Sequence, residues 1–238
     1  MKYNLDKYLS NNNMYIIIRG HIRNSFDTTI LYNFIKELSL NYKIKIYIHT
    51  WSIKQNNVSW RPIDNDFTVI DNNYIYSYFK DLSKYIKKII IDNDSNIKLI
   101  GNLEGKILST KTFILGWKRY IYSQNKIISY LYNKIKNKNN FLLNLRFDLF
   151  SNSYTFPYNE IITFVNNNYN KNIYSNKFLR DGEYCGIDNI IIGSVKTNFS
   201  LINYIHNNLD NILLENENLI HPEFIVCRTN NKLNKILF

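Results

Sequence analysis

The stretch "MYIIIRGHIRNSFDTTILYNFIKELSLNYKIKIYIHT", residues 14–50, decides the fold. Its first five residues form an apolar run rich in β-branched side chains, which favours a strand. Residues 28–42 then repeat apolar side chains at the spacing of one helix face. Residues 43–50 alternate lysine with isoleucine and read as a second strand. This order predicts a βαβ unit with parallel strands and a right-handed crossover.

The rest of the chain carries further strand and helix patterns. We expect strands over 67–70 and 87–92, with a helix over 74–86 between them. Later expected elements are a helix over 113–138, a strand over 140–150, a strand over 187–194 and a helix over 199–216. Together with the βαβ unit, these elements predict an α/β protein with a Rossmann-like open sheet flanked by helices. No linker divides the chain, so we expect a single domain spanning residues 1–238.

The composition limits the class of protein. The chain has 238 residues, of which 45% are hydrophobic, enough for a sizeable core. No window approaches the roughly 18 uncharged apolar residues of a membrane span, and the N-terminal residues contain no apolar leader. Cys185 and Cys227 are the only cysteines, too few for a disulfide framework or a zinc site. We therefore expect a cytoplasmic protein.

The formal net charge of +11 has to be interpreted against a compositional bias. The sequence is rich in Asn, Ile, Lys and Tyr and contains no alanine, as AT-rich coding sequences of some intracellular parasites and large DNA viruses do. We attribute much of the positive charge to this bias. Arginine supplies only seven of the 30 basic residues, so positions that keep arginine are better pointers to function than lysines.

Polar residues follow the first two expected strands at the point where each ends. Arg19, Gly20, His21 and Arg23 follow the first strand, and His49, Thr50 and Trp51 follow the second. Ligands of open α/β sheets bind at the carboxyl ends of the strands, near the switch point of strand order. A glycine lets a ligand approach the backbone, and an arginine offers a planar fork to phosphate oxygens. The loop after the first strand is therefore a candidate anion site.

Other candidates carry a structural alternative. Trp60 and Arg61, in "SWRP", offer an aromatic face and a guanidinium suited to a base or sugar, or they stack only on each other. His21 and His49 are, taken singly, more often structural than catalytic. "GHIRN" matches neither a Walker loop nor the GxGxxG fingerprint, which argues against ATPase and dinucleotide-binding functions.

The segment "LRFDLF" has two interpretations. Side chains alternate along a strand, so Arg146 and Asp148 point to the same side and are placed to pair with each other. At the carboxyl end of the strand, Asp148 is instead a hard oxygen ligand that suits a divalent cation bound to a pyrophosphate. We prefer contact with metal or substrate over an internal salt bridge.

Short motifs occur in order along the chain: "IIIRGHIRNSF", "IYIHTW" with "SWR", "NLRFDL", "DNIIIGS" and "HPE". In this order the sequence resembles a group of polysaccharide and lipopolysaccharide glycosyltransferases, bacterial and giant-viral, similar in pattern to the WavE type. The resemblance covers most of the chain. It implies a GT-A type fold, an open mixed sheet that binds a nucleotide-sugar donor, and transfer of the sugar to a glycan or polysaccharide acceptor.

The resemblance also implies roles for particular residues. In such enzymes an acidic motif at a strand end binds Mn²⁺ or Mg²⁺ and the donor diphosphate, a role that falls to Asp148 with Arg146. The usual pair of aspartates is replaced here by Arg, Phe and Asp, which leaves metal dependence open and makes Arg146 a partial substitute for the cation. We assign the nucleotide-binding half to about 14–105 and the acceptor half to about 106–238. The residues assigned to donor binding are Arg19, Gly20, His21, Arg23, His49, Trp51, Trp60, Arg61 and Arg146.

Transfer to an acceptor also needs a group that takes the proton of the acceptor hydroxyl, if the enzyme is inverting. The candidates are Asp181, Glu183, Asp188 and Glu223. Asp188 precedes the apolar run "IIIG" and is preferred, with Glu223 in "HPE" as the second choice. Asp188 is equally consistent with a structural carboxylate at a strand edge or turn.

Two other functions stay open at this stage. A pI near 9.4, with many tyrosines among the lysines, is compatible with a nucleic-acid-binding protein. Against that function, the basic residues are spread through the whole sequence and no recognition motif occurs. A catalytically inactive glycosyltransferase-like scaffold is the third possibility, because the acidic motif is incomplete.

Overall fold

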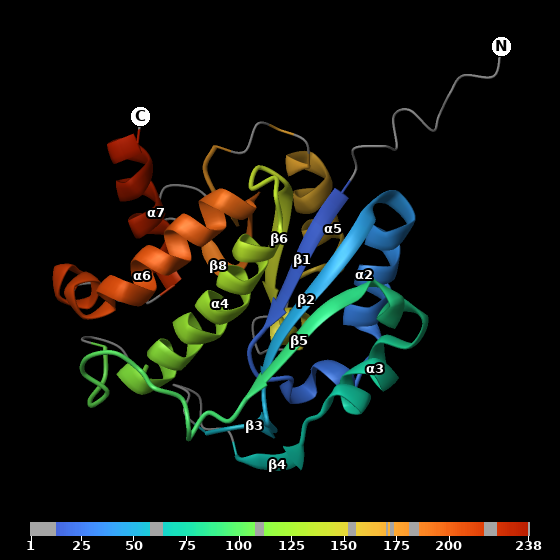
Figure 1. The fold of residues 1–238 in the computed structure, drawn as a ribbon, viewed down its shortest axis with the longest axis horizontal. Coiled ribbons are helices and arrows are strands. Elements are labelled where there is room, and N and C mark those ends of the chain that lie inside the picture. Colours follow the sequence, from blue (N-terminus) through green and yellow to red (C-terminus); the bar gives the residue numbers. More distant parts are fainter. Residues whose placement is uncertain are drawn as a thin grey trace.

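The computed structural model has a six-stranded mixed sheet with helices packed on both faces (Figure 1). The structure describes residues 13–57, 64–107, 112–151, 156–169, 171, 174–180, 186–216 and 223–237. This architecture confirms the predicted α/β class and is compatible with a Rossmann-like fold. The division into halves stays a prediction.

The first βαβ unit forms as the sequence predicts. Strand β1 (Asn13–Arg19) leads through helix α2 (Ile30–Asn41) to strand β2 (Lys43–Trp51). The two strands are parallel, and Arg19 is opposite His49 at their carboxyl ends. Both loops that follow these strands therefore lie at one edge of the sheet.

The strand order reverses beside β1. The sheet has the order β5-β2-β1-β6-β8-β7, so the chain moves outward from β1 through β2 to β5 and then returns to the other side of β1 as β6. The remaining strands are β5 (Ile86–Asp92), β6 (Phe141–Arg146), β7 (Lys177–Leu179) and β8 (Ile187–Ser194). Strands β5, β2, β1 and β6 are parallel, whereas β8 is antiparallel to β6. The carboxyl ends of β1 and β6 thus form the switch point at which open α/β sheets bind ligands.

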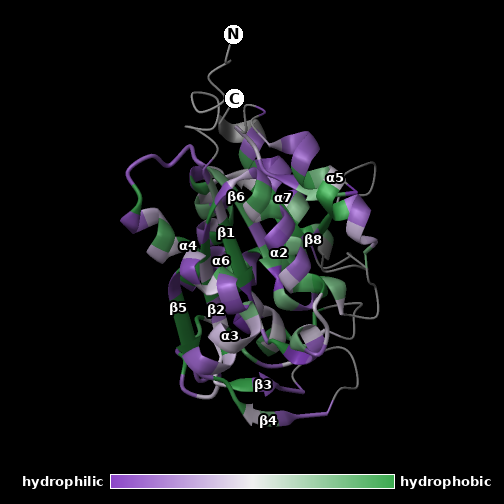
Figure 2. Cartoon of the chain, turned by 90° about the vertical axis from the view of Figure 1, so that its right-hand side faces the viewer, coloured by the Kyte–Doolittle hydropathy of each residue, from purple (hydrophilic) through white to green (hydrophobic). Residues whose placement is uncertain are grey.

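Helices cover the two faces of the sheet in two groups (Figure 1). Helices α4 (Ile114–Lys134), α6 (Val195–Glu215) and α7 (Glu223–Leu237) lie on one face, and α2, α3 (Asn72–Phe79) and α5 (Tyr158–Asn168) lie on the other. Residues 14–18 of β1 alternate between the two cores, so this central part of the strand is a continuous hydrophobic run. Figure 2 shows this in the mainly hydrophobic colour of β1 and β5 and the mixed colours of the helices.

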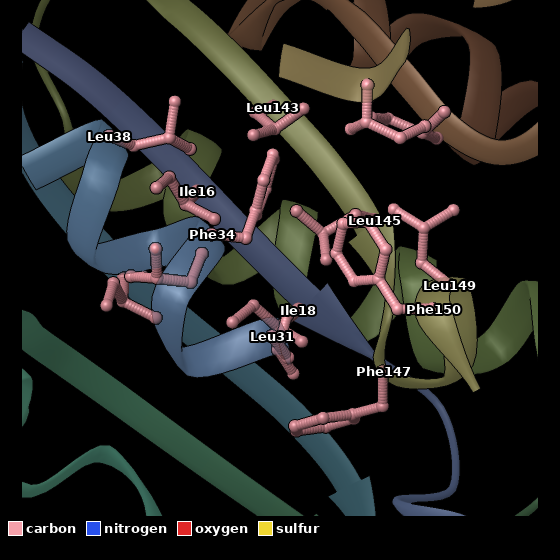
Figure 3. Close-up of a cluster of buried hydrophobic side chains, with 14 of the residues drawn as sticks. Ile16, Ile18, Leu31, Phe34, Leu38, Leu143, Leu145, Phe147, Leu149 and Phe150 are labelled. Carbon is pink, nitrogen blue, oxygen red and sulfur yellow. The ribbon is translucent and has the colours of Figure 1, made fainter. Parts of the chain in front are cut away.

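The core under α2 also fixes the end of β6 (Figure 3). Phe34 of α2 packs among Ile16 and Ile18 of β1 and Leu143 and Leu145 of β6. Beyond Arg146 the chain turns into a short 3₁₀ helix, and its apolar residues Phe147, Leu149 and Phe150 enter the same core. Consecutive residues of a strand cannot face the same side, so the chain leaves the strand conformation here.

This turn corrects the predicted strand over 140–150. The strand ends at Arg146, and Asp148 lies in the 3₁₀ helix Phe147–Phe150. The two side chains nevertheless form the internal pair that was the less-favoured interpretation of this segment, because the turn brings the carboxylate of Asp148 back over the guanidinium of Arg146.

The strand expected over 67–70 forms as β4 (Asp66–Val69), but its expected place in the main sheet is wrong. It pairs antiparallel with β3 (Ile53–Gln55) in a separate two-stranded sheet. Phe67 and Val69 are 70% and 73% exposed, so apolar residues alone did not indicate burial. Both short strands lie beyond the carboxyl ends of the main strands (Figure 1).

The helices agree with their predictions except near residue 80. The helix expected over 74–86 is α3 followed by the 3₁₀ segment Lys80–Tyr85, because Lys80 has a positive φ of 48° and ends the α-helix. Helices α4 and α6 match their apolar spacing, whereas β7, α5 and α7 had not been predicted. Within the described part of the chain, no helix is long and apolar enough to cross a membrane.

Candidate functional site

A polar pocket of about 70 Å³ opens at the switch point between β1 and β6. Its floor and walls come from the loop after β1, the carboxyl ends of β2 and β6, and the N-terminal half of α4. The lining residues are Gly20, His21, Arg23, Trp51, Gly116, Arg119, Tyr120, Ser123, Arg146 and Asp148. The sequence predicted six of these ten as site residues, so the strand-end rule located this pocket correctly.

Arg19 lies directly behind this pocket and is 1% exposed. Its Nε donates to Asn144 Oδ1 at 2.8 Å, its Nη2 donates to the carbonyl of Asp188 at 2.9 Å, and its Cζ lies 4.6 Å from the ring centre of Tyr120. Its Nη1 has no acceptor, and among the described residues no carboxylate lies within 4.0 Å of the guanidinium. Burial lowers the pKa of Arg19, which shows that its charge is held at an energetic cost.

Asp148 is bound by two arginines of the pocket. Arg146 donates to it from Nε and Nη2, both at 2.7 Å, and Arg23 donates from Nη1 at 2.7 Å. Arg146 also donates to Asn189 Oδ1 at 3.0 Å. Burial lowers the pKa of Arg146, but the charge of Asp148, its hydrogen bond and the nearby Tyr120 and Asp188 together outweigh burial, so the pKa is raised. The Arg146 guanidinium is therefore held in one orientation with its charge intact.

The loop that presents Arg23 has an unusual backbone. Gly20 has φ 97° and Arg23 has φ 50°. The N–H of Gly20 donates to the carbonyl of His49 at 3.1 Å, and its carbonyl accepts from Thr50 Oγ1 at 3.0 Å, so β2 fixes the loop. A positive φ costs a non-glycine residue about 1–2 kcal/mol. This strain is stored where the Arg23 side chain must reach the pocket.

Arg119 enters the pocket from α4. Its Nη1 lies 3.1 Å from Asp94 Oδ2, its Nη2 donates to the Asp94 carbonyl at 2.9 Å, and Asn56 donates to the same carboxylate at 2.7 Å. The Nε of Arg119 is buried and has no acceptor.

His21 lies beside Arg119, and its Nε2 also has no hydrogen-bond partner. Burial, together with the charges of Arg23 and Arg119, lowers the pKa of His21 to about 3. The imidazole is therefore neutral near pH 7. Its 4.0 Å separation from Asp94 is too long for a hydrogen bond, so this contact is not an ion pair.

His49 is buried in a chain of hydrogen bonds rather than at the pocket wall. Its Nε2 lies 3.2 Å from Asp92 Oδ2, and its Nδ1 lies 2.9 Å from Ser123 Oγ. Tyr122 donates to the same oxygen of Asp92 at 2.9 Å. A carboxylate only accepts, so the proton of His49 is on Nε2 and Ser123 donates to Nδ1. The histidine therefore links β2 to β5 and α4, as its structural alternative requires.

Asp188, the preferred catalytic base, is also buried. Its carboxylate accepts from Tyr120 at 2.8 Å, and its carbonyl accepts from Tyr120 at 3.1 Å as well as from Arg19. It lies within β8 rather than before it, and it does not line the pocket. In this arrangement Asp188 orients Tyr120, whose ring lies 5.7 Å from the Cζ of Arg146. Its role as a base stays a prediction.

The remaining predicted residues are not placed at the pocket. Trp60, Arg61, Asp181 and Glu183 lie outside the described residues, and Glu223 begins α7 with a side chain that is also outside them. Sequence analysis missed Arg119, Tyr120 and Ser123, because the spacing of α4 was interpreted as core alone. The rarity of arginine was the available signal for Arg119.

Asp148 as arranged here does not fit a divalent cation. Both of its oxygens already accept from guanidiniums, whose positive charges repel a cation at that position. Within the described residues no group of three or more His, Cys, Asp or Glu side chains is arranged to hold a metal ion. The described residues thus offer no support for the Mn²⁺ or Mg²⁺ that the resemblance implies.

A second pocket, of about 170 Å³, lies between α4 and α6. Its charged residues Lys118 and Asp210 pair with each other at 2.6 Å, and Lys118 also donates to the carbonyl of Ile100. This pairing satisfies both charges within the protein. The larger pocket therefore offers a ligand fewer charged groups than the smaller pocket at the switch point.

No protein-family model matches this sequence, and no curated protein sequence matches it either.

The site combines the guanidiniums of Arg19, Arg23, Arg119 and Arg146 with the carboxylates of Asp94, Asp148 and Asp188. Such an arrangement is suited to binding an anion with several oxygens.

Proposed function

We propose that this protein is a glycosyltransferase of GT-A type that moves a sugar from a nucleotide-sugar donor to a glycan or polysaccharide acceptor. The observation that carries the proposal is the meeting of four of the seven arginines at the switch point of the sheet. They come from β1, the loop after it, α4 and β6, which lie far apart in the sequence. The motif resemblance, whose motifs include Arg19, Arg23 and Arg146, supports the same function.

The chemistry of glycosyl transfer explains why arginines are useful there. The bond between the anomeric carbon and the donor phosphate breaks, and negative charge develops on the departing nucleoside diphosphate. Guanidiniums that are already oriented stabilise that charge without reorganising during the reaction. Arg23 and Arg146 are oriented by Asp148, and Arg119 is oriented by Asp94.

The pocket also provides surfaces for the uncharged parts of the donor. Trp51 and Tyr120 line it together with the backbone of Gly20, where no side chain blocks a close approach. Trp51 is itself braced by His49 and Tyr122, with ring centres 5.1 Å and 6.1 Å away. Phosphates at the arginines would therefore leave the sugar and base near aromatic walls, a common arrangement for carbohydrate and base recognition.

A thermal-shift panel tests the function. UDP, GDP, CMP and dTDP sugars are added with and without Mn²⁺, and one class is expected to stabilise the protein by about 2.7 kcal/mol at 100 times its Kd. Arg23→Ala should abolish most of this stabilisation. Arg180→Ala is the matched control, because Arg180 is an exposed arginine that is also paired with a carboxylate, Glu160. If no nucleotide sugar stabilises the wild-type protein while DNA does so in a salt-sensitive way, the nucleic-acid-binding function replaces this proposal.

A further inference from the structure

The guanidiniums around Asp148 occupy the space in which a cation would have to bind. Arg146 covers both carboxylate oxygens, and Arg23 shares one of them. From this geometry we propose that the site binds the phosphates of its ligand without a divalent cation. Arg23, Arg119 and Arg146 neutralise the phosphate charge, and Asp148 is a positioning residue for two of them. The identity of the ligand as a nucleotide sugar rests on the proposed function. The binding of phosphate groups does not.

The first support is the state of Asp148. A cation ligand needs a free lone pair directed at the metal, and Mg²⁺ or Mn²⁺ prefers several oxygen ligands around it. Here three N–H groups, each at 2.7 Å, converge on the two oxygens. Removing them to admit a metal would break charge-assisted hydrogen bonds, which are about twice as strong as neutral ones. The carboxylate is thus committed to orienting arginines.

The second support is a set of buried nitrogen atoms that lack partners. Arg119 Nε and His21 Nε2 belong to residues that line the pocket, and Arg19 Nη1 lies behind it. Buried donors are rarely left without an acceptor, and those that are need an explanation. Because guanidiniums donate and never accept, the missing partner of the two arginines is an acceptor, as a phosphate oxygen is.

The third support is the charge balance of the cluster. Among the described residues, four guanidiniums face three carboxylates, those of Asp94, Asp148 and Asp188, so this described part of the cluster carries an excess of one positive charge when all are ionised. Adding a divalent cation would increase that excess inside a partly buried site. Adding an ionised phosphate group removes it. The neutral state of His21 fits the same picture, because the neighbouring arginines already disfavour another positive charge there.

The fourth support is that the arginines are preorganised. Gly20, which has a positive φ, holds the loop after β1 against β2 through its hydrogen bonds with His49 and Thr50. Arg146 is fixed at the end of β6 by Asp148 and Asn189. A site assembled before the ligand arrives loses little side-chain entropy on binding. It therefore does not need a metal ion to organise the diphosphate.

Inorganic pyrophosphate in the presence of EDTA tests this inference directly. Isothermal titration calorimetry should show binding to the wild-type protein in EDTA, with a Kd that changes less than threefold when Mg²⁺ or Mn²⁺ replaces the chelator. Arg23→Ala and Arg119→Lys should each raise the Kd at least tenfold, the loss expected for one charge-assisted hydrogen bond. Arg180→Ala should leave the Kd unchanged, because Arg180 does not line the pocket and pairs with Glu160.

Asp148→Asn separates the two roles of the carboxylate. If Asp148 positions arginines, pyrophosphate binding weakens but remains independent of metal. If Asp148 binds a cation, wild-type binding needs the metal and the variant loses that dependence, which would overturn the inference. If the Asn variant does not fold, the Kd of pyrophosphate is still measured for Arg119→Lys, which keeps a positive charge beside Asp94.

The outcomes also separate this inference from the proposed function. Pyrophosphate that binds in EDTA while every nucleotide sugar fails would support the metal-free phosphate site and remove the glycosyltransferase. Nucleotide sugars that bind only with Mn²⁺ or Mg²⁺ would support the glycosyltransferase and overturn the metal-free site. Absence of pyrophosphate binding under both conditions would overturn it as well.

Discussion

Arg146 and Asp148, only two positions apart, form a bidentate ion pair in which Nε and Nη2 each donate to a different carboxylate oxygen at 2.7 Å. The pair forms because β6 ends at Arg146 and the following turn buries Phe147, Leu149 and Phe150. The hydrophobic turn therefore sets the position of the carboxylate, and the carboxylate sets the position of the guanidiniums in the pocket.

Asp148→Asn should lower the free energy of unfolding by about 2–4 kcal/mol. The substitution keeps the shape of the side chain but leaves the partly buried guanidinium of Arg146 without its counter-charge, and it removes the charged acceptor of Arg23 as well. Urea denaturation of the protein without ligand measures the loss. The matched control is Glu160→Gln, which breaks a similar bidentate pair with Arg180, at 2.7 and 2.8 Å, on the surface. That change should cost less than about 1 kcal/mol, and equal losses in the two variants would contradict our account of the buried pair.

His21 should make stability depend on pH below its ordinary pKa of 6.5. Its pKa in the folded protein is lowered to about 3, so between pH 6.5 and 3 the unfolded chain binds a proton that the folded protein does not. The free energy of unfolding therefore falls as pH decreases, by up to about 1.4 kcal/mol per pH unit from this residue. His21→Asn should lose that slope. Urea denaturation at pH 7, 6 and 5 checks this, and parallel curves for the two proteins would show that His21 titrates normally.

Gly20→Ala should destabilise the protein by about 1–2 kcal/mol, through its backbone alone. Gly20 has φ 97°, and a Cβ added there meets no atom within 4 Å, so strain rather than a clash is the cause. Gly105→Ala is a close control, because Gly105 has φ 82° and equally open space around it but lies away from the pocket. Both variants should melt lower, and only Gly20→Ala should weaken pyrophosphate binding. Equal binding by the two would place the ligand away from the loop after β1.

Ser123→Ala should cost about 1–3 kcal/mol although it improves helix propensity. The change removes the donor to His49 Nδ1, and it leaves that nitrogen buried without a partner on the side of α4. Ser129→Ala, in the same helix, removes a longer contact of 3.3 Å to Asn125 and should be nearly neutral. Chemical denaturation compares the two variants. A neutral effect of Ser123→Ala would mean that the histidine does not depend on this hydroxyl.

The fold was predictable where the pattern of apolar residues in a segment matched the faces of that segment that are buried. Residues 14–18 of β1 form a continuous hydrophobic run because both faces of the sheet are covered, and α2 shows one apolar face because it covers only one of them. For β4 the strand was predicted but its place in the main sheet was wrong, because its apolar residues Phe67 and Val69 resemble those of a core strand but are exposed. The spacing of apolar side chains predicts the type of element, but it does not show whether another element packs over those side chains.

The site was predictable where residues follow strand ends. Arg19, Gly20, His21 and Arg23 meet Arg146 and Asp148 because β1 and β6 are neighbours, a pairing that the strand-end rule anticipates at a switch point. Arg119 was missed because it lies within a helix. The end of a strand indicates which residues reach the edge of the sheet, whereas a position in a helix does not. The chain Ser123–His49–Asp92 was missed because it joins three elements, and only tertiary contacts bring them together.

The most direct measurement of the central claim is a ¹H–¹⁵N spectrum of the arginine Nε–H groups during titration. The ligand is the nucleotide sugar that stabilises the protein most in the thermal-shift panel. The account predicts that the Nε–H signals of Arg23, Arg119 and Arg146 shift as the site saturates, while those of Arg180 and Arg228 do not. Saturable binding that leaves the signals of Arg23, Arg119 and Arg146 unchanged would show that the switch-point pocket is not the donor site.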